Sequence, residues 1–189
     1  MGKFSVISQD AFSEFQVDAG VLLNFFNPED PGMNEDEIIC ATTGGINPSC
    51  VPTFVDFGED VDNCPNNMME LKQISGYECS LGFTALNTTP EVIKMALGAA
   101  DTGTHGSITP RNKLNERDFK DIWWVGDRSD GGLVAIQLVN ALSTGGFSLQ
   151  TTKSGKGQIA VTLTGHVSIE DQDAVPMVFY VQANPDIEE

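Results

Sequence analysis

The sequence predicts a mainly β protein, a β-sandwich or partly open barrel with one flanking α-helix. The strongest observation is the segment of residues 158–169, where five of the six odd positions are large and apolar and none of the even positions is. Because side chains alternate between the two faces of a strand, this pattern predicts one unusually long strand with an apolar face and a small, polar face. Further short extended segments bring the expected total to about eight strands, and only one segment has a helical pattern.

The N-terminal half contains expected strands separated by glycine, proline and acidic residues. Residues 1–16 mix Phe4, Phe12 and Phe15 with polar residues, and we expect them to form an N-terminal arm. The expected strands of this half are residues 18–26, 37–43, 52–57 and 68–86, the last with a bend at Gly76.

Residues 43–67 are predicted to form a long loop, extended only over its 52–57 segment, because they combine several glycines and prolines with a cluster of acids. A loop of this length is uncommon in a compact domain and is usually functional, although a mobile surface excursion is the alternative. The residues of this loop that we expect to make contacts are Gly45, Pro48, Pro52, Glu59, Asp60 and Asp62.

The C-terminal half begins with the single expected helix, over residues 91–100. Thr88 precedes Glu91 by three residues, the spacing of a capping box, and Pro90 suits a first helical turn. A polar loop is expected over residues 101–115. Later strands are expected over residues 119–125, 133–142, 147–152, 158–169 and 176–181, with 147–169 forming a hairpin.

Composition limits the classes of function. The 189 residues suit one domain, 1–189, and 27 acidic against 10 basic residues give a formal net charge of −17. Such a chain should repel nucleic acid and anionic membranes, since phosphate binding requires clustered Lys and Arg. The sequence shows neither a secretory signal nor a long apolar run, so we expect no membrane association and a reducing cytoplasm with free thiols.

No pattern predicts catalysis, a cofactor or a metal. The four cysteines are too widely spaced for a zinc site with the two histidines, and the glycine-rich pieces lack the lysine of a phosphate-binding loop. There is no nucleophile elbow. Acid pairs such as Asp127 with Asp130 could serve a glycosidase or bind Ca²⁺, but close pairs arise by chance among 27 acids. We therefore expect a protein that is not an enzyme.

The segment NALSTGGFSLQTTKSGKGQIAVTLTGHVSIEDQDAVPMVFYV, residues 140–181, resembles the C-terminal part of tail tube (major tail) proteins of long-tailed bacteriophages. Residues 58–101 and 122–141 resemble the same proteins, so the resemblance covers most of the chain from about residue 17. It lies in the ordered succession of strands, glycine turns, an acidic turn and a short closing strand. No single motif in it is a chemical signature.

The resemblance implies a structural virion protein without catalytic residues. Similar proteins self-assemble into hexameric rings in which every subunit contributes long strands to an inter-subunit β-barrel, and the rings stack into a tube through which DNA passes during ejection. The implied partners are other copies of the chain and the tape measure, terminator and tail tip proteins, with viral DNA only in transit. The implied location is the virion tail, after assembly in the cytoplasm of a bacterial host.

Two surfaces are candidates for these roles. The small, polar face of the expected long strand is the candidate lumen or inter-strand face, and it comprises Thr162, Thr164, His166 and Ser168. Six copies at −17 each carry −102, and a lumen lined by acids and small polar side chains would repel DNA. The 43–67 loop is the candidate for docking onto the adjacent ring.

Two alternatives remain open at this stage. Another ring-forming assembly, such as the inner tube of a contractile tail, a secretion needle or a head–tail connector, would share the ring geometry but have different partners. A carbohydrate-binding β-sandwich module of a tail tip would need exposed aromatic side chains on one face, and the adjacent Trp123 and Trp124 are the only hint of them. These two side chains should point to opposite faces of their strand.

Overall fold

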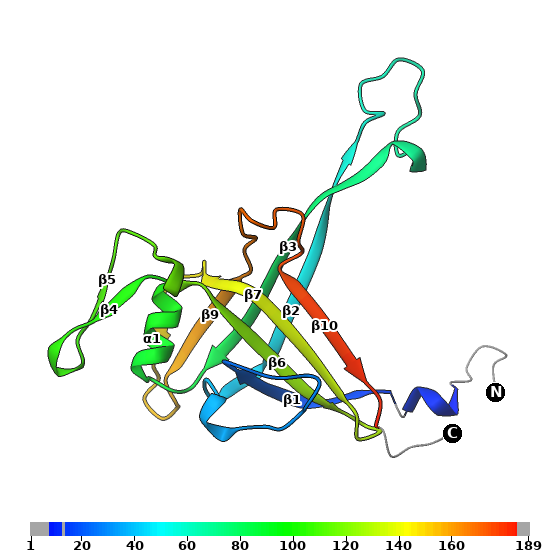
Figure 1. Cartoon of the computed structure of the whole chain (residues 1–189). Coiled ribbons are helices and arrows are strands. Elements are labelled where there is room, and N and C mark those ends of the chain that lie inside the picture. The colour runs from blue at the N-terminus through cyan, green and yellow to red at the C-terminus, as the bar shows by residue number, and fades with distance from the viewer. Residues whose placement is uncertain (1–7, 13, 185–189) are drawn as a thin grey trace.

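The computed structural model describes residues 8–12 and 14–184, and these residues form ten strands and one α-helix (Figure 1). The prediction of a mainly β protein with one helix is therefore confirmed. The elements are β1 Gln16–Leu23, β2 Thr42–Asp56, β3 Lys72–Ala85, α1 Pro90–Leu97, β4 Ala100–Thr102, β5 Ile108–Pro110, β6 Lys120–Arg128, β7 Leu133–Ser143, β8 Leu149–Gln150, β9 Gln158–Thr164 and β10 Met177–Gln182, with short 3-10 helices at Gln9–Phe12, Glu35–Glu37, Met69–Leu71, Thr104–Gly106 and Glu116–Asp118.

Eight strands form one large antiparallel sheet in the order β1-β6-β7-β9-β3-β2, with β10 added to β7 and β8 added to β9. The sheet changes direction at β7, which pairs with β6 and β10 along much of its length but with β9 only through Leu142 and Ser143. Side chains from both halves meet in one main core. Within the described residues the sheet does not close into a barrel, so β1 and β2 remain at its two ends.

The core follows from the alternation in β9 and β3. Ile159, Val161 and Leu163 are buried, whereas the even-numbered residues from 158 to 162 are exposed. Leu81 and Phe83 of β3 lie opposite Leu163 and Val161, so the apolar faces of the two strands coincide. Burial of such side chains is the main source of stability for the sheet.

The single helix covers part of this core. α1 packs its buried residues Val92 and Ala96 into the main cluster, on the flank away from the long hairpin (Figure 1). Thr89 is the N-cap and accepts a hydrogen bond from the Val92 N–H, while Gly98 ends the helix with a positive φ of 78°. The expected helix is confirmed, but its cap is Thr89 rather than Thr88, one residue later than the capping-box spacing indicated.

The prediction of one strand over residues 158–169 is wrong beyond Thr164. At Gly165 the chain leaves β3 and turns toward β7. The Gly165 N–H still donates to the Cys79 carbonyl of β3 at 2.9 Å, whereas the next N–H, that of His166, donates to the Val139 carbonyl of β7. A Cβ on Gly165 would lie 2.8 Å from both Leu138 Cδ1 and the Pro176 carbonyl oxygen, so only glycine fits. Tertiary packing therefore ends the strand where the alternation of side chains continues.

The prediction of a loop over residues 43–67 is wrong for residues 43–56 and confirmed for residues 57–67. Residues 42–56 form β2, the longest strand, and only residues 57–71 connect it to β3. β2 is an edge strand, so backbone groups on its outer side have no partner in the sheet. A proline whose nitrogen faces that side removes no ladder hydrogen bond, and residues four apart in a strand face the same side. Pro48 and Pro52 are therefore compatible with β2. Gly44 and Gly45 form a bulge with positive φ rather than a break.

The other expected elements are mostly confirmed, with shifted ends. β6, β7, β10 and the β8–β9 hairpin occur where strands were expected, and β1 is interrupted by a bulge between Val17 and Val21. The strand expected over residues 37–43 is wrong as drawn, because residues 37–41 form no strand and make only an isolated bridge to β1 between Leu23 and Ile38, while residues 42–43 begin β2. The loop expected over residues 101–115 contains the small β4–β5 ribbon. Of the expected N-terminal arm, residues 1–7 and 13 lie outside the described residues.

Trp123 and Trp124 point to opposite faces of β6, as expected. Trp124 lies in the main core and donates its indole N–H to the Ala19 carbonyl at 3.0 Å. Trp123 lies in a second cluster, with its ring centroid 5.8 Å from that of Phe26 and 5.6 Å from that of Tyr180. In the part of the chain described, no helix has the length and apolar character needed to cross a membrane.

Candidate assembly surfaces

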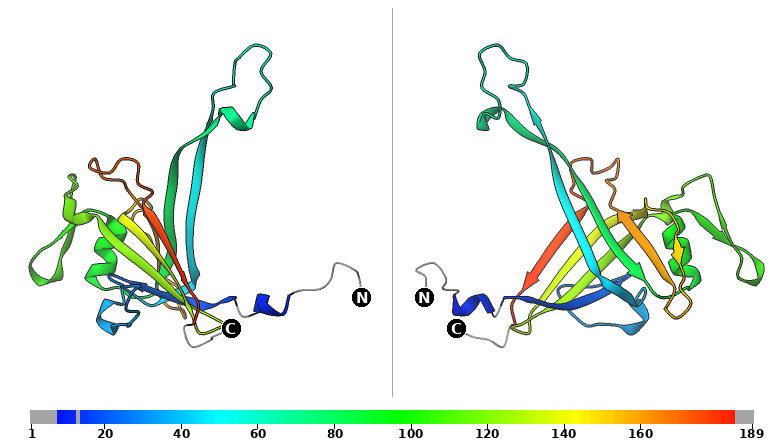
Figure 2. Two further views of the ribbon diagram at one scale, coloured as in Figure 1. Left: turned by 45° about the vertical axis from the view of Figure 1, so that its right-hand side comes forward. Right: turned by 180° about the vertical axis from the view of Figure 1, so that it is seen from behind.

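The most distinctive feature is a projecting hairpin, which we call the arm: residues 50–56 of β2, residues 72–79 of β3 and the connecting tip, residues 57–71. β9 pairs with β3 only from Ser80 to Ala85, and Gly165 adds one hydrogen bond to Cys79, so among the described residues β3 pairs with β2 alone over residues 72–78. Figures 1 and 2 show the resulting two-stranded ribbon standing away from the body. A two-stranded ribbon alone is only marginally stable in water, so a partner surface is expected to stabilise this one.

The arm continues the core-facing side of the sheet into solvent. Pro52 lies opposite Tyr77, and Phe54 lies opposite Ile74, so the four side chains share one face, here called the arm apolar face. On the body the same face of β2 and β3 carries Cys50, Cys79 and Leu81, which pack in or against the main core. On the arm no layer of the described chain covers it.

Exposure on the arm is large for apolar side chains. Phe54 is 51% exposed and Ile74 is 50% exposed, and Val51 and Val55 on the opposite face are also exposed. The tip adds Phe57 and Met69. Contiguous exposed apolar surface of this kind usually marks a protein–protein contact.

The tip is held closed by Asp56. One carboxylate oxygen accepts the Gly58 N–H at 2.9 Å, and the other accepts the Asn67 N–H at 2.8 Å. Lys72 donates to the Asn67 side-chain oxygen at 3.0 Å, and its ammonium lies 5.2 Å from the centre of the Phe54 ring. These contacts join the two ends of the tip.

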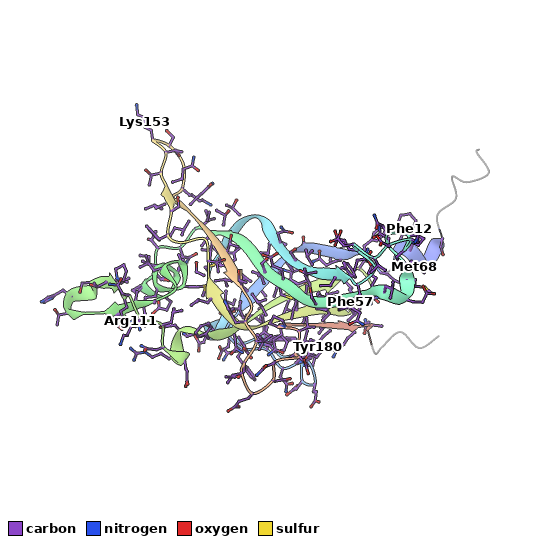
Figure 3. The ribbon with its side chains drawn as sticks, turned by 90° about the horizontal axis from the view of Figure 1, so that it is seen from above. Phe12, Phe57, Met68, Arg111, Lys153 and Tyr180 are labelled. Carbon is purple, nitrogen blue, oxygen red and sulfur yellow. The ribbon has the colours of Figure 1, made fainter. Side chains whose placement is uncertain are left out.

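The acids of the expected docking loop are separated from its glycine and prolines. Glu59, Asp60 and Asp62 are exposed on the tip, whereas Pro48 and Pro52 lie within β2 and Gly45 lies in the bulge at its start. Seen from above, the tip residues Phe57 and Met68 lie on the side of the molecule away from Arg111 and Lys153 (Figure 3). The docking candidate is therefore the tip alone.

Acid should loosen the tip. The hydrogen bonds from Gly58 and Asn67, with a smaller contribution from Lys72, hold the pKa of Asp56 below the usual value of an aspartate. A carboxyl whose pKa is lower in the folded protein stabilises the fold above its unfolded pKa and loses this effect as the pH falls through the folded value. We therefore expect the Gly58 and Asn67 amides to lose protection from hydrogen exchange below about pH 4. Asp56→Ala should show low protection already at pH 6, and equal protection in both proteins would contradict the clamp.

A second surface lies on the opposite side of β2, β3 and β9 from the core. The register places eight small, uncharged residues on it, which we call the small polar face: Asn47, Ser49, Ser80, Gly82, Thr84, Ala160, Thr162 and Thr164. Gly82, for example, lies between Asn47 and Thr162. The Thr164 hydroxyl is 2.8 Å from the hydroxyl of Thr144, which lies in the loop after β7 and extends the polar surface.

Only half of the predicted lumen set lies on this face. Thr162 and Thr164 do, but His166 follows the bend and is partly buried, with Nδ1 3.1 Å from the Asn140 carbonyl oxygen and its ring centroid 5.3 Å from that of Phe119. Ser168 lies in a turn, where its hydroxyl accepts the Glu170 N–H. Placing His166 and Ser168 on the same strand face was therefore wrong, because the strand ends at Thr164.

The remaining members of the small polar face were missed by sequence reasoning. They come from two other strands, and strand pairing brings them beside Thr162. One local signal was present, since residues 80–84 alternate small or polar with large apolar side chains as residues 158–163 do.

Unpaired strand edges form the third assembly feature. β1 and β2 lie at the two ends of the sheet, β1 being bridged on its outer side at Leu23 to Ile38, and among the described residues β10 pairs only with β7. β10 also exposes Val178, Phe179 and Val181. Open edges present unpaired backbone groups that a second chain can satisfy.

The described residues show no cluster of side chains suited to catalysis or to holding a metal. They contain no group of three or more His, Cys, Asp or Glu arranged to hold a metal. A surface hollow of about 680 Å³ is lined by the single stretch Leu114, Asn115, Glu116 and Arg117. The partly buried ion pairs, Arg111 with Asp118 and Arg128 with Asp130, tie loops to the body.

The two adjacent tryptophans do not support a sugar-binding surface. Trp123 is 6% exposed and Trp124 is 7% exposed, and both are enclosed by core side chains. Neither ring can therefore offer a flat platform to a sugar.

No protein-family model matches the chain, and no curated protein is significantly similar to it. The fold and the three surfaces are therefore the basis for inferring what the protein does.

Proposed function

We propose that the protein is a structural subunit that assembles with copies of itself into stacked hexameric rings, forming the tail tube of a long-tailed bacteriophage. The observation that carries this proposal is the arm, whose apolar face extends the core side of the sheet without a covering layer. The partner we propose is a second copy of the chain, because each copy carries both an uncovered face and open sheet edges. The hexameric number and the phage tail come from the sequence resemblance alone.

The energetics favour a closed assembly. Phe54 and Ile74 are about half exposed, so covering them should contribute roughly 0.8–1.5 kcal/mol for each side chain, and every subunit in a ring makes the same contact. A rotation that closes also pairs the strand edges of each copy with those of its neighbours and leaves no free edge within the ring. Both contributions increase with the number of neighbours, as a tube requires.

The small polar face is the proposed lumen surface. A conduit for DNA needs a lining that neither binds phosphate nor holds bases by stacking, and this face offers neither lysine, arginine nor aromatic side chains. The net charge of −17 per chain adds a repulsive field. Such a lining would allow rapid passage, with DNA in transit and not bound. Tape measure, terminator and tail tip proteins are the proposed neighbours at the ends and inside of the tube.

Lysines on the small polar face should slow DNA passage. We expect particles carrying Thr162→Lys and Thr164→Lys to eject their genome more slowly, because phosphate groups would bind the added ammonium groups, and higher salt should relieve the delay. Time-resolved ejection in a DNA-dye assay measures this. The matched control carries Thr104→Lys and Thr109→Lys on the β4–β5 ribbon, beside the helix. Equal ejection rates in the two variants would contradict the lumen placement.

A further inference from the structure

Two thiols face each other where the arm leaves the body. Cys50 of β2 and Cys79 of β3 are direct cross-strand partners, and their Sγ atoms are 3.2 Å apart. Both cysteines are free, Cys79 being buried and Cys50 partly exposed. Cys79 is also the last residue of β3 before the paired segment with β9 begins at Ser80. The pair therefore lies at the boundary between the three-stranded body and the two-stranded arm.

The backbone geometry suits a covalent bridge. Directly opposite residues in an antiparallel pair have Cα atoms about 4.5–5.5 Å apart, which lies within the roughly 4.4–6.8 Å range of disulfides. The neighbouring pairs Ser49–Ser80 and Val51–Glu78 fix both strands at this distance. Bond formation thus requires mainly a rotation of the two side chains, with little displacement of the strands.

We propose that Cys50 and Cys79 form a redox latch, in which a cross-strand disulfide locks the base of the arm. The oxidant is a small-molecule disulfide such as oxidised glutathione. The Cys50 thiolate attacks one sulfur of the oxidant, giving a mixed disulfide and one glutathione thiolate. The Cys79 thiolate then attacks the Cys50 sulfur and releases the second. The protein loses two protons and two electrons, and one oxidant molecule becomes two thiols.

The surroundings assign the order of the two steps. Burial, followed by the hydrogen bond with Cys50, raises the pKa of the Cys79 thiol to about 12, so Cys79 is a poor first nucleophile. Cys50 is the more accessible of the two. A shallow hollow of about 370 Å³ lies beside the arm base and includes Cys79 and Gly165 in its lining, which leaves space near the pair. The other two cysteines have different surroundings. Burial raises the pKa of the Cys40 thiol to about 11, and the Cys64 thiol contacts Met68 on the tip.

The latch would enclose the whole arm in one covalent loop, because residues 51–78 lie between the two cysteines. A closed loop of this kind restricts the open states of the enclosed segment. Where the proposed function holds, the thiols stay reduced in the host cytoplasm during assembly and oxidise once the particle is outside the cell. The latch itself is independent of that function, since it needs only the folded subunit.

Thiol trapping on the purified full-length protein tests the latch. We expect treatment with oxidised glutathione, followed by iodoacetamide, to leave Cys40 and Cys64 alkylated and to yield a peptide that joins Cys50 to Cys79. Cleavage of the arm by protease should then be slower by about tenfold or more, and dithiothreitol should reverse the effect. Cys64→Ser should behave as wild type, whereas Cys50→Ser should show no protection.

Three results would overturn the latch: a reaction that stops at glutathione on Cys50, a bridge that involves Cys40 or Cys64, or a disulfide-linked dimer. The half-buried Cys50→Ser is the preferred variant because Cys79 lies in the core and its replacement risks unfolding. The readout is a property of the single subunit, so a failure to form tubes leaves the test valid. Conversely, a missing latch would not affect the proposed assembly.

Discussion

Replacing Phe54 and Ile74 together by serine is expected to abolish tube formation while the subunit stays folded. Both side chains are about half exposed on the arm, so the free subunit loses little packing. In the assembly the exposed halves would be covered, and losing two such contacts at roughly 0.8–1.5 kcal/mol each should raise the critical concentration for assembly by about tenfold or more. Sedimentation of assembled material over a concentration series measures this, and circular dichroism checks the fold.

The matched control replaces Leu114 by serine. Its side chain is 55% exposed, close to the 51% of Phe54 and the 50% of Ile74, but it lies in the loop after β5 on a different surface. This variant should assemble as wild type does. Normal tubes from the Phe54→Ser, Ile74→Ser protein would show that the arm apolar face is not the contact between copies.

Replacing the tip with Asn-Gly should uncouple ring formation from stacking. Asp56 and Lys72 are paired residues of β2 and β3, so a two-residue turn between them matches the register of the hairpin. The substitution removes residues 57–71 and keeps the arm apolar face. We expect folded subunits that form single rings and no tubes, as seen by size-exclusion chromatography and electron microscopy.

The boundary of this replacement matters because residues 42–56 form β2. A deletion that began near Gly45 would remove an edge strand paired with β3 along its length and would test folding rather than stacking. Full-length tubes from the tip-replaced protein would refute the assignment of the tip as the ring-to-ring contact. Unchanged tubes from a variant with only Glu59, Asp60 and Asp62 replaced by serine would show that the acids are dispensable there.

Much of the fold could be predicted from local pattern. The alternation in β9 as far as Leu163, the apolar run of β7 and the helix before Gly98 each depend on their own residues, and each is present. β2 could not be predicted in this way, because Pro48 and Pro52 indicate a loop unless the strand is known to lie at a sheet edge. Edge position is a property of the whole topology.

The candidate surfaces were predictable only in part, for the same reason. Thr162 and Thr164 could be placed on one face from their spacing, but the other members of the small polar face join them through pairing with β3 and β2. The prediction that this face continues to His166 is wrong, because Gly165 fits against Leu138 and Pro176 and the chain bends there. Neither contact is visible in a local stretch of sequence.

Electron microscopy of the purified protein in negative stain tests the central claim most directly. If the arm and the open edges are completed by neighbouring copies, a concentrated sample should contain rings with a central hole, and tubes built from them at regular spacing. A sample that stays a monodisperse monomer at high concentration, with the arm apolar face still exposed to solvent, would contradict the proposed assembly.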